Sequence, residues 1–304
     1  MIIFVNPHSA AGTALKKWKR VIQKIPSGAK VFYLSKELDP EEKIKESISS
    51  GEYEFVAAGG DGTVNLILNG MISAAEPGII NKLKLGAIGL GSSNDFHKPA
   101  LNKEAIPFRI NFNNAQPRDV PFISFKNEDK EITKYFLINA SLGITADANY
   151  FFNNPGYILK YLKKINTNLA IICSALHTII GYQNTPVKIN CREKGRLSCF
   201  LTNLGVVKNP HFSGNLSYHG SANYNNGKFN IHLCYNMNLW EIIFLFLTLN
   251  FHRFNRIKKK VSWKTPAIEI SSAKPFNVEF DGEVVHTNRV KFDILPEYLR
   301  VCND

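Results

Sequence analysis

The 304-residue sequence predicts an α/β protein in two parts: an amino-terminal α/β domain over residues 1–121 and a second, mainly antiparallel β-sandwich domain over residues 122–295. In the first part, short apolar runs alternate with amphipathic helical patterns. In the second, β-rich runs follow one another with turns between them. We expect the last residues, 296–304, to pack back on the first domain.

The chain opens with a short apolar run at Ile2–Val5, which predicts a buried strand. Beyond a turn, Leu15, Trp18, Ile22 and Ile25 recur at the spacing of one helix face. We therefore expect a helix that packs on the sheet through these four side chains.

A second strand is predicted at Val31–Leu34, followed by a helix with a clear start signal. Asp39 can accept hydrogen bonds from free backbone N–H groups at the helix start, and Pro40 suits the first helical position. Ile44 and Ile48 then mark the buried face of this helix.

Further strands are predicted at Phe55–Ala57 and Leu83–Ile88. The helix predicted between them has one apolar face, formed by Val64, Ile67, Leu68, Met71 and Ile72. Parallel strands joined by helices bring their carboxyl ends to one edge of the sheet, where ligands of such folds bind. We therefore look for function in the turns that follow Val5, Ala58 and Ile88.

The second part contains the runs VKINC, CFLTNLGVV, KFNIHLCY and VEFDGEVV, which are typical of strands. Two mainly helical stretches, at about residues 150–182 and 239–254, interrupt them.

The chain carries 37 Lys and Arg residues against 25 acidic ones, a net charge of +12 that favours an anionic partner. The basic residues are dispersed and no nucleic-acid recognition motif is present, so we expect no nucleic-acid partner. Five cysteines without a C-x-x-C pair, and an amino terminus without a secretory pattern, indicate a cytoplasmic protein. The longest apolar run is shorter than the ~20 residues that span a bilayer.

The sequence Gly59-Gly60-Asp61-Gly62-Thr63-Val64-Asn65 lies between a strand and a helix. Glycines allow backbone N–H groups to approach a phosphate, and the positive end of the helix faces the anion. The Asp61 carboxylate would repel that phosphate unless a divalent cation or a proton in transfer lay between them. A tight turn without a ligand is the alternative.

Two more turns are predicted at the same edge. Ser92, Ser93, Asn94 and Asp95 follow the fourth strand and offer hydroxyls, an amide and a carboxylate to a nucleotide, although Ser and Asn are also ordinary helix caps. The turn Asn6–Gly12 follows the first strand.

Five motifs follow one another along the chain: N-P-x-S from Asn6, G-G-D-G-T-x-N from Gly59, G-[ST]-x-N-D-F from Gly91, N-x-x-x-G-x-x-x-D-A from Asn139 and D-G-E from Asp281. This order resembles the diacylglycerol kinase catalytic-domain family, which includes bacterial diacylglycerol and other lipid kinases and the sphingosine and ceramide kinases. NAD kinases and phosphofructokinases share a similar G-G-D-G turn, whereas the N-D-F and D-G-E motifs are much more specific.

The resemblance implies an ATP- and Mg²⁺-dependent kinase whose nucleotide is held by a set of small and polar residues: Asn6, Ser9, Gly59, Gly60, Gly62, Thr63, Ser92, Ser93 and Asn94. Asp61 would serve the metal or the phosphates, and Asp95 and Asp119 match acidic positions of the family's site region. Glu283 matches the general base that takes the proton of the acceptor hydroxyl. Asp281 is expected on the opposite face of the strand if that segment is extended up to the turn. The alternative is that the turn begins at Asp281 itself, since D-G-E alone also suits a hairpin turn.

The sequence departs from the family pattern at three places. Bacterial members often read S-G-x-G where this chain has Ser9-Ala10-Ala11-Gly12, and Leu66 replaces a common Glu. Bacterial members also bind a structural magnesium through an Asp for which this chain has Asn226. An amide oxygen is a weaker ligand than a carboxylate for a hard cation.

A helical segment, Leu239–Phe254, bears on the question of membrane contact. It places Trp240, Ile243, Phe244, Leu247 and Phe251 at helical spacing, and it is closely followed by basic residues: Arg253, Arg256, Lys258, Lys259 and Lys260. This pattern fits an interfacial helix on an anionic membrane, and equally a core helix followed by a solvated charge run.

We therefore predict a peripheral membrane enzyme of lipid metabolism, acting in phospholipid biosynthesis. It would transfer the γ-phosphate of ATP to a lipid hydroxyl in the cleft between the two domains, and the expected acceptor is diacylglycerol or a related lipid. A kinase of a soluble acceptor such as NAD and an inactive nucleotide-binding relative are the alternatives.

Overall fold

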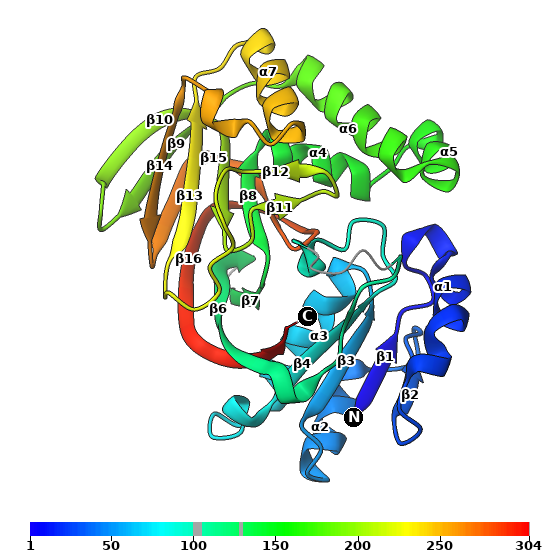
Figure 1. The fold of residues 1–304 in the computed structure, drawn as a ribbon. Coiled ribbons are helices and arrows are strands. Elements are labelled where there is room, and N and C mark those ends of the chain that lie inside the picture. Colours follow the sequence, from blue (N-terminus) through cyan, green and yellow to red (C-terminus); the bar gives the residue numbers. More distant parts are fainter. Residues whose placement is uncertain (100–104, 128–129, 304) are drawn as a thin grey trace. The chain divides into compact units, whose positions relative to one another are not determined.

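The computed structural model describes residues 1–99, 105–127 and 130–303, which divide into two compact units (Figure 1). The first unit contains residues 1–120 and 295–304, and the second contains residues 121–294. The strand β16 (Glu283–Cys302) runs from the second unit into the first.

The first unit is built on a parallel sheet in the order β2-β1-β3-β4, with the end of β16 beside β4. Its strands are β1 (Ile2–Val5), β2 (Lys30–Tyr33), β3 (Glu54–Gly59) and β4 (Lys84–Gly89). All four lie within two residues of their predicted bounds, so the local apolar pattern was sufficient to locate them.

The helix α1 (Ala14–Val21) covers one face of this sheet, but through a different stripe than predicted. Ala14, Trp18 and Val21 are buried, whereas Leu15 and Ile22 are exposed. The prediction was correct for Trp18 and for Ile25, which packs partly buried against the same core, but wrong for Leu15 and Ile22. The helix ends at Val21 and the chain tightens into a 3₁₀ turn at Ile22–Lys24, so the helical spacing does not continue through Ile22.

The other two helices of this unit follow the prediction. α2 (Pro40–Ser49) begins where expected, because the Asp39 carboxylate accepts a hydrogen bond from Glu41 N at 2.9 Å. α3 (Asp61–Ala74) buries the predicted stripe: Val64, Ile67, Leu68, Met71 and Ile72.

The second unit is a mainly antiparallel β domain, as predicted, with the strand order β14-β13-β10-β8-β15-β16. These strands are β8 (Asn139–Gly143), β10 (Gly195–Val207), β13 (Phe229–Tyr235), β14 (Lys260–Thr265) and β15 (Ile268–Phe280). The long strands β10 and β15 each pair with β8 along one half and with β9 (Thr185–Cys191) along the other. A continuous apolar core that includes Leu142, Ile189, Leu204 and Val278 fills this unit.

The α-helices in the described part of the second unit are α4 (Ile144–Asn153), α5 (Tyr157–Ile165), α6 (Thr167–Gly181) and α7 (Leu239–Asn250). α7 packs on the unit through Ile242, Leu245 and Leu249, which are buried. Within residues 1–99, 105–127 and 130–303, no helix is both long and apolar enough to cross a membrane.

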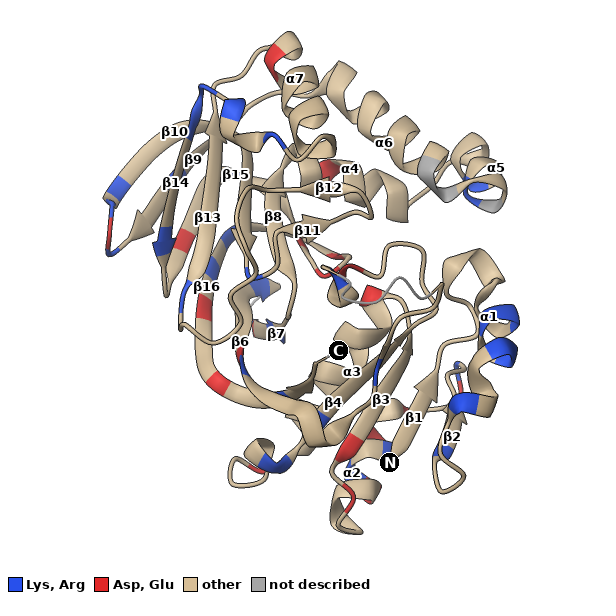
Figure 2. Cartoon of the chain, in the orientation of Figure 1, with Lys and Arg blue, Asp and Glu red and all other residues tan. Residues whose placement is uncertain are grey.

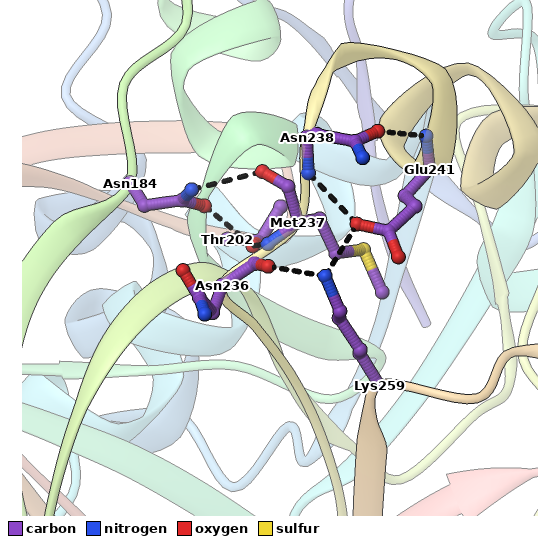
Figure 3. A network of polar contacts seen from close by, with 7 residues as sticks. All are labelled: Asn184, Thr202, Asn236, Met237, Asn238, Glu241 and Lys259. Atoms are coloured by element: carbon purple, nitrogen blue, oxygen red, sulfur yellow. Dashed lines mark hydrogen bonds and ion pairs between the residues drawn. The ribbon is translucent and has the colours of Figure 1, made fainter.

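A polar network fixes the start of α7 (Figure 3). Asn238 and Glu241 form a reciprocal capping box, and the Lys259 ammonium donates to Glu241 Oε2 at 2.7 Å and to the carbonyl of Asn236 at 2.9 Å. This ion pair lowers the pKa of the Glu241 carboxyl. Lys259 is therefore part of the fold and not a free member of the basic run.

Candidate functional site

Three turns leave the sheet of the first unit at the carboxyl ends of β1, β3 and β4. The chain passes from β1 to β2 on one side, while β3 lies on the other side of β1. A crevice opens at such a switch point in open α/β sheets, and ligands bind there. The turns after β1 and β3 border this point, and the turn after β4 lies next to them.

The first two turns are joined by hydrogen bonds centred on Thr63. Asn6 Nδ2 donates to Thr63 Oγ1 at 3.0 Å, and the hydroxyl oxygens of Ser9 and Thr63 are 3.5 Å apart. Asn6 N also donates to the carbonyl of Ala58 at 2.9 Å. Asn6, Ser9 and Thr63, which the sequence predicts to bind one nucleotide, thus lie together.

The second and third turns touch through glycines. A Cβ added to Gly91 would lie 2.4 Å from Gly60 Cα, and one added to Gly59 would lie 2.2 Å from Thr63 Oγ1. Leu90 N and Gly91 N both donate to the carbonyl of Gly59, at 2.8 and 3.0 Å. Glycine is needed at positions 59 and 91 because backbone and side-chain atoms occupy the space of a side chain.

Asp61 is the first residue of α3, and its half-buried carboxylate links the second turn to the third. Its Oδ1 accepts a hydrogen bond from Phe96 N at 2.9 Å. Gly62, the next residue, is exposed at the helix start. The positive end of α3 and the carboxylate thus lie at one point of the rim.

The third turn depends on Asn94, whose backbone is left-handed with a φ of 49°. Its Nδ2 donates to the carbonyls of Gly89 at 3.1 Å and Gly91 at 3.4 Å. Asn94 thus closes the turn, while Ser92 is exposed and Ser93 is half-buried.

Lys17 is a residue of this site that sequence reasoning missed. Its ammonium, on α1, donates to the carbonyls of Leu90 at 3.1 Å and Gly91 at 2.7 Å, and burial lowers its pKa. Lys17 therefore ties the helix after the first turn to the third turn. Among the neighbouring basic residues of KKWKR, no local signal singles it out.

The two other predicted acids of the first unit have structural partners. The buried Asp95 carboxylate pairs with the Lys98 ammonium at 2.6 Å. Buried Asp119 accepts a hydrogen bond from Glu297 N at 3.0 Å and so fastens the carboxyl-terminal segment to β6 (Ala115–Asn127).

The D-G-E motif lies in the second unit, at the turn between β15 and β16. Glu283 is exposed at the start of β16. Asp281 does not continue the strand, as the extended reading required, because its φ of 45° starts the turn. Its buried carboxylate instead accepts hydrogen bonds from Leu137 N, Ile138 N and Asn139 N, at 2.7, 3.0 and 3.1 Å.

Further polar contacts support this turn. Glu279 accepts from Gly282 N at 2.8 Å, and Asn153 Nδ2 donates to the carbonyl of Gly282 at 2.8 Å. On α4, Asp147 accepts from Asn277 Nδ2 at 2.9 Å, and burial raises the pKa of Asp147. Asp147, the acid of the N-x-x-x-G-x-x-x-D-A motif, received no role from the sequence.

The site's donor set can be compared with the needs of ATP and Mg²⁺. Glycine turns and a helix start suit phosphate groups. Mg²⁺ in phosphoryl-transfer sites is held by one or two carboxylates together with substrate phosphates, a need that Asp61 fits. No group of three or more His, Cys, Asp or Glu side chains within the described residues forms a metal cage.

Solved structures share this two-unit fold. Two described as putative diacylglycerol kinases from Bacillus anthracis str. Sterne are each 18% identical, with TM-scores of 0.69 and 0.68; they cover 100% of this chain and are themselves covered to 94% and 96%. A third, described as a diacylglycerol kinase from the same organism, is 15% identical with a TM-score of 0.61. The fold is therefore that of the two-domain, diacylglycerol kinase-like proteins.

Within that class, residues 1–113 match the family model described as the diacylglycerol kinase catalytic domain, which confirms the resemblance inferred from the motifs. Sphingoid long chain base kinase 4 of Schizosaccharomyces pombe is 26% identical over 159 residues. That alignment covers 49% of this chain and 33% of the yeast kinase, so only about a third of the relative is represented.

Proposed function

We propose that this protein is an ATP- and Mg²⁺-dependent lipid kinase that phosphorylates a lipid hydroxyl, with diacylglycerol as the first acceptor to test. The observation that carries the kinase assignment is the linkage of three turns at the switch point of the first unit, with Asp61 at their rim. Those turns lie within the residues that match the catalytic-domain model.

In this proposal the first unit holds the nucleotide. Backbone N–H groups of the glycine turns and the start of α3 bind the phosphates. Bound Mg²⁺ supplies charge neutralisation at the phosphates, and Asp61 is its protein ligand. Thr63 and Asn94 keep the turns in register through the contacts described above.

Glu283 of the second unit acts as general base. Its carboxylate takes the proton of the acceptor hydroxyl while a bond forms between that oxygen and the γ-phosphorus, and the bond from the γ-phosphorus to the bridging oxygen breaks to release ADP. Asp281 contributes indirectly, because its three backbone hydrogen bonds hold the turn that carries Glu283.

An exposed apolar surface on the second unit supports a lipid acceptor. Trp240 on α7 is 76% exposed and Phe251, directly after this helix, is 63% exposed, although the opposite face of α7 is buried. α5 and α6 add further exposed side chains: Tyr157, Ile158, Tyr161, Ile165, Leu169, Ile172, Leu176 and Ile180. Figure 2 shows that α6 and α7 carry almost no charged residues. Such a surface is typical of protein or membrane contact sites.

Exposed basic residues follow α7, so we propose an anionic membrane surface as the partner. Arg253, Arg256 and Lys258 are exposed, whereas Lys259 caps α7 and Lys260 lies over the Phe254 ring at 5.1 Å. The apolar face would enter the interface while the exposed cations contact lipid headgroups.

Vesicle sedimentation tests this contact, with vesicles of phosphatidylcholine with and without phosphatidylglycerol. Changing Arg253, Arg256 and Lys258 together to Gln should weaken the free energy of binding to the anionic vesicles by about 1 kcal/mol per charge. The remaining binding should also depend less on salt. Trp240→Ala should weaken binding at every salt concentration.

The matched control removes three charges elsewhere on the second unit, by Gln substitution of the exposed Arg192, Lys194 and Arg196 at the turn between β9 and β10. This control should leave vesicle binding unchanged. Equal losses in the control and the test variant would refute the assignment of this surface.

The acceptor itself is tested with γ-labelled ATP and a panel of diacylglycerol, monoacylglycerol, ceramide, sphingosine and NAD. A labelled lipid that Glu283→Gln fails to form supports the proposal. Labelled NADP without labelled lipid would instead identify a soluble acceptor, and ATP binding without any labelled product would indicate an inactive relative.

A further inference from the structure

Lys208 is a buried cation that no catalytic step above uses. It follows β10 directly and is 1% exposed. By volume, it is among the largest of the fully buried side chains in the described residues. Burial of an ammonium is costly unless oxygen atoms accept its hydrogen bonds.

The side chain reaches the turn before β13. Lys208 Nζ donates to Asn226 Oδ1 at 3.1 Å and to the backbone carbonyl of Lys228 at 3.1 Å. The same Asn226 oxygen accepts from Lys228 N at 3.2 Å, and Asn223 N donates to the carbonyl of Lys208 at 3.3 Å. The positively charged ammonium thus binds two oxygen atoms of the same turn.

Asn226 is the position at which the family resemblance implied an Asp ligand for a structural magnesium. The residues here do not fit that ion. Asn226 contributes a neutral amide oxygen, and a buried ammonium already contacts the oxygens that a metal would need. A second cation at this point would meet the charge of Lys208 at close range, without a carboxylate from Asn226 to offset it.

We infer that the Lys208 ammonium replaces the divalent cation at this turn, so that the second unit folds and keeps its turn without magnesium. Lysine donates up to three hydrogen bonds and can therefore bind the oxygens that would otherwise coordinate an ion. The cation is supplied by the chain and cannot be removed by a chelator.

The position of Lys208 also connects this turn to the D-G-E motif. Lys208 N and Asn209 N both donate to the carbonyl of Ile138, at 3.0 and 2.9 Å, and Ile138 N donates to Asp281 Oδ1 at 3.0 Å. Lys208 therefore contacts the turn at Asn226 through its ammonium, and through its backbone the segment that holds Asp281.

The test measures thermal unfolding by calorimetry and near-ultraviolet circular dichroism, without nucleotide, in EDTA and in MgCl₂. The wild-type Tm should be equal in both. Lys208→Met should unfold several degrees lower, since it removes the ammonium that donates to both Asn226 Oδ1 and the carbonyl of Lys228. The double variant Lys208→Ala with Asn226→Asp should instead gain a Tm that rises with magnesium and falls with EDTA.

Two outcomes would overturn the inference. One is a Tm that rises with magnesium both in the wild type and in the Asp61→Asn variant. Because that variant lacks the expected metal ligand of the first unit, such a rise would have to come from another site. The other is a folded double variant that ignores magnesium. Should Lys208→Met fail to fold, Asn226→Asp decides in its place: with the ammonium retained, its Tm should stay independent of magnesium.

Discussion

The contact between Gly60 and Gly91 offers a sharp test of the nucleotide site. In Gly91→Ala the new Cβ would meet Gly60 Cα at 2.4 Å and Asn94 Oδ1 at 2.8 Å. Carbon atoms in ordinary contact are about 3.5–4.0 Å apart, so the turns must separate by roughly 1 Å. Such overpacking costs about 1–3 kcal/mol.

That free energy must appear in one of two measurements. If the turns stay in contact, the strain lowers the Tm. If the turns move apart, ATP binding has to bring them together again, and the same cost of about 1–3 kcal/mol is subtracted from the binding free energy. ATP affinity then falls by roughly 5- to 150-fold. Calorimetric titration with ATP and a thermal melt of the same sample separate the two.

Gly78→Ala is the matched control, because a Cβ there meets nothing within 4 Å and Gly78 has no positive φ. This variant should keep both the Tm and the ATP affinity of the wild type. If Gly91→Ala also keeps both, the close approach of the two turns plays no part in the nucleotide site.

The remaining predictions concern three charged or titratable groups. Glu283→Gln should bind ATP with near-normal affinity while lipid phosphorylation falls at least about 100-fold, as expected for a lost general base; loss of ATP affinity would make Glu283 a nucleotide or metal ligand. Asp61→Asn keeps the shape of the side chain and should abolish turnover with little change in Tm; near-normal turnover would exclude its role. Burial lowers the pKa of His232 to about 4, below the usual value of 6.5. As pH falls from 6.5 toward 4, His232 is protonated in the unfolded protein but not in the folded one. The free energy of unfolding should therefore be highest above pH 6.5 and decrease by up to about 3 kcal/mol toward pH 4. Denaturant titrations should show that the free energy of unfolding of His232→Gln decreases less between pH 6.5 and 4 than that of the wild type. An unchanged pH dependence would show that His232 is not the group responsible.

The sequence alone located the parallel strands and the edge at which their turns meet. Their apolar runs are short, bounded and separated by helical patterns, so local information was sufficient. The α3 stripe was also predicted correctly, because it extends over several turns. The α1 stripe was predicted only in part, since a helix of two turns is too short for its spacing to identify one buried face.

The order of β1 and β3 in the sheet required the tertiary structure. Only this order shows that the turns of Asn6 and Thr63 border the switch point and touch each other. Likewise, the extended reading of VEFDGE suggested that Asp281 faces away from Glu283. The structure shows a turn whose carboxylate is held by residues more than 140 positions earlier in the chain.

The roles of individual lysines were decided by tertiary structure alone. Lys17 binds the turn at Leu90 and Gly91, Lys208 binds the turn at Asn226, and Lys259 caps α7 through Glu241. A lysine side chain is long and flexible, and its partners lie 18 to 74 residues away. The local sequence pattern does not predict such partners, because the path of the backbone determines which oxygen atoms come within reach of each ammonium.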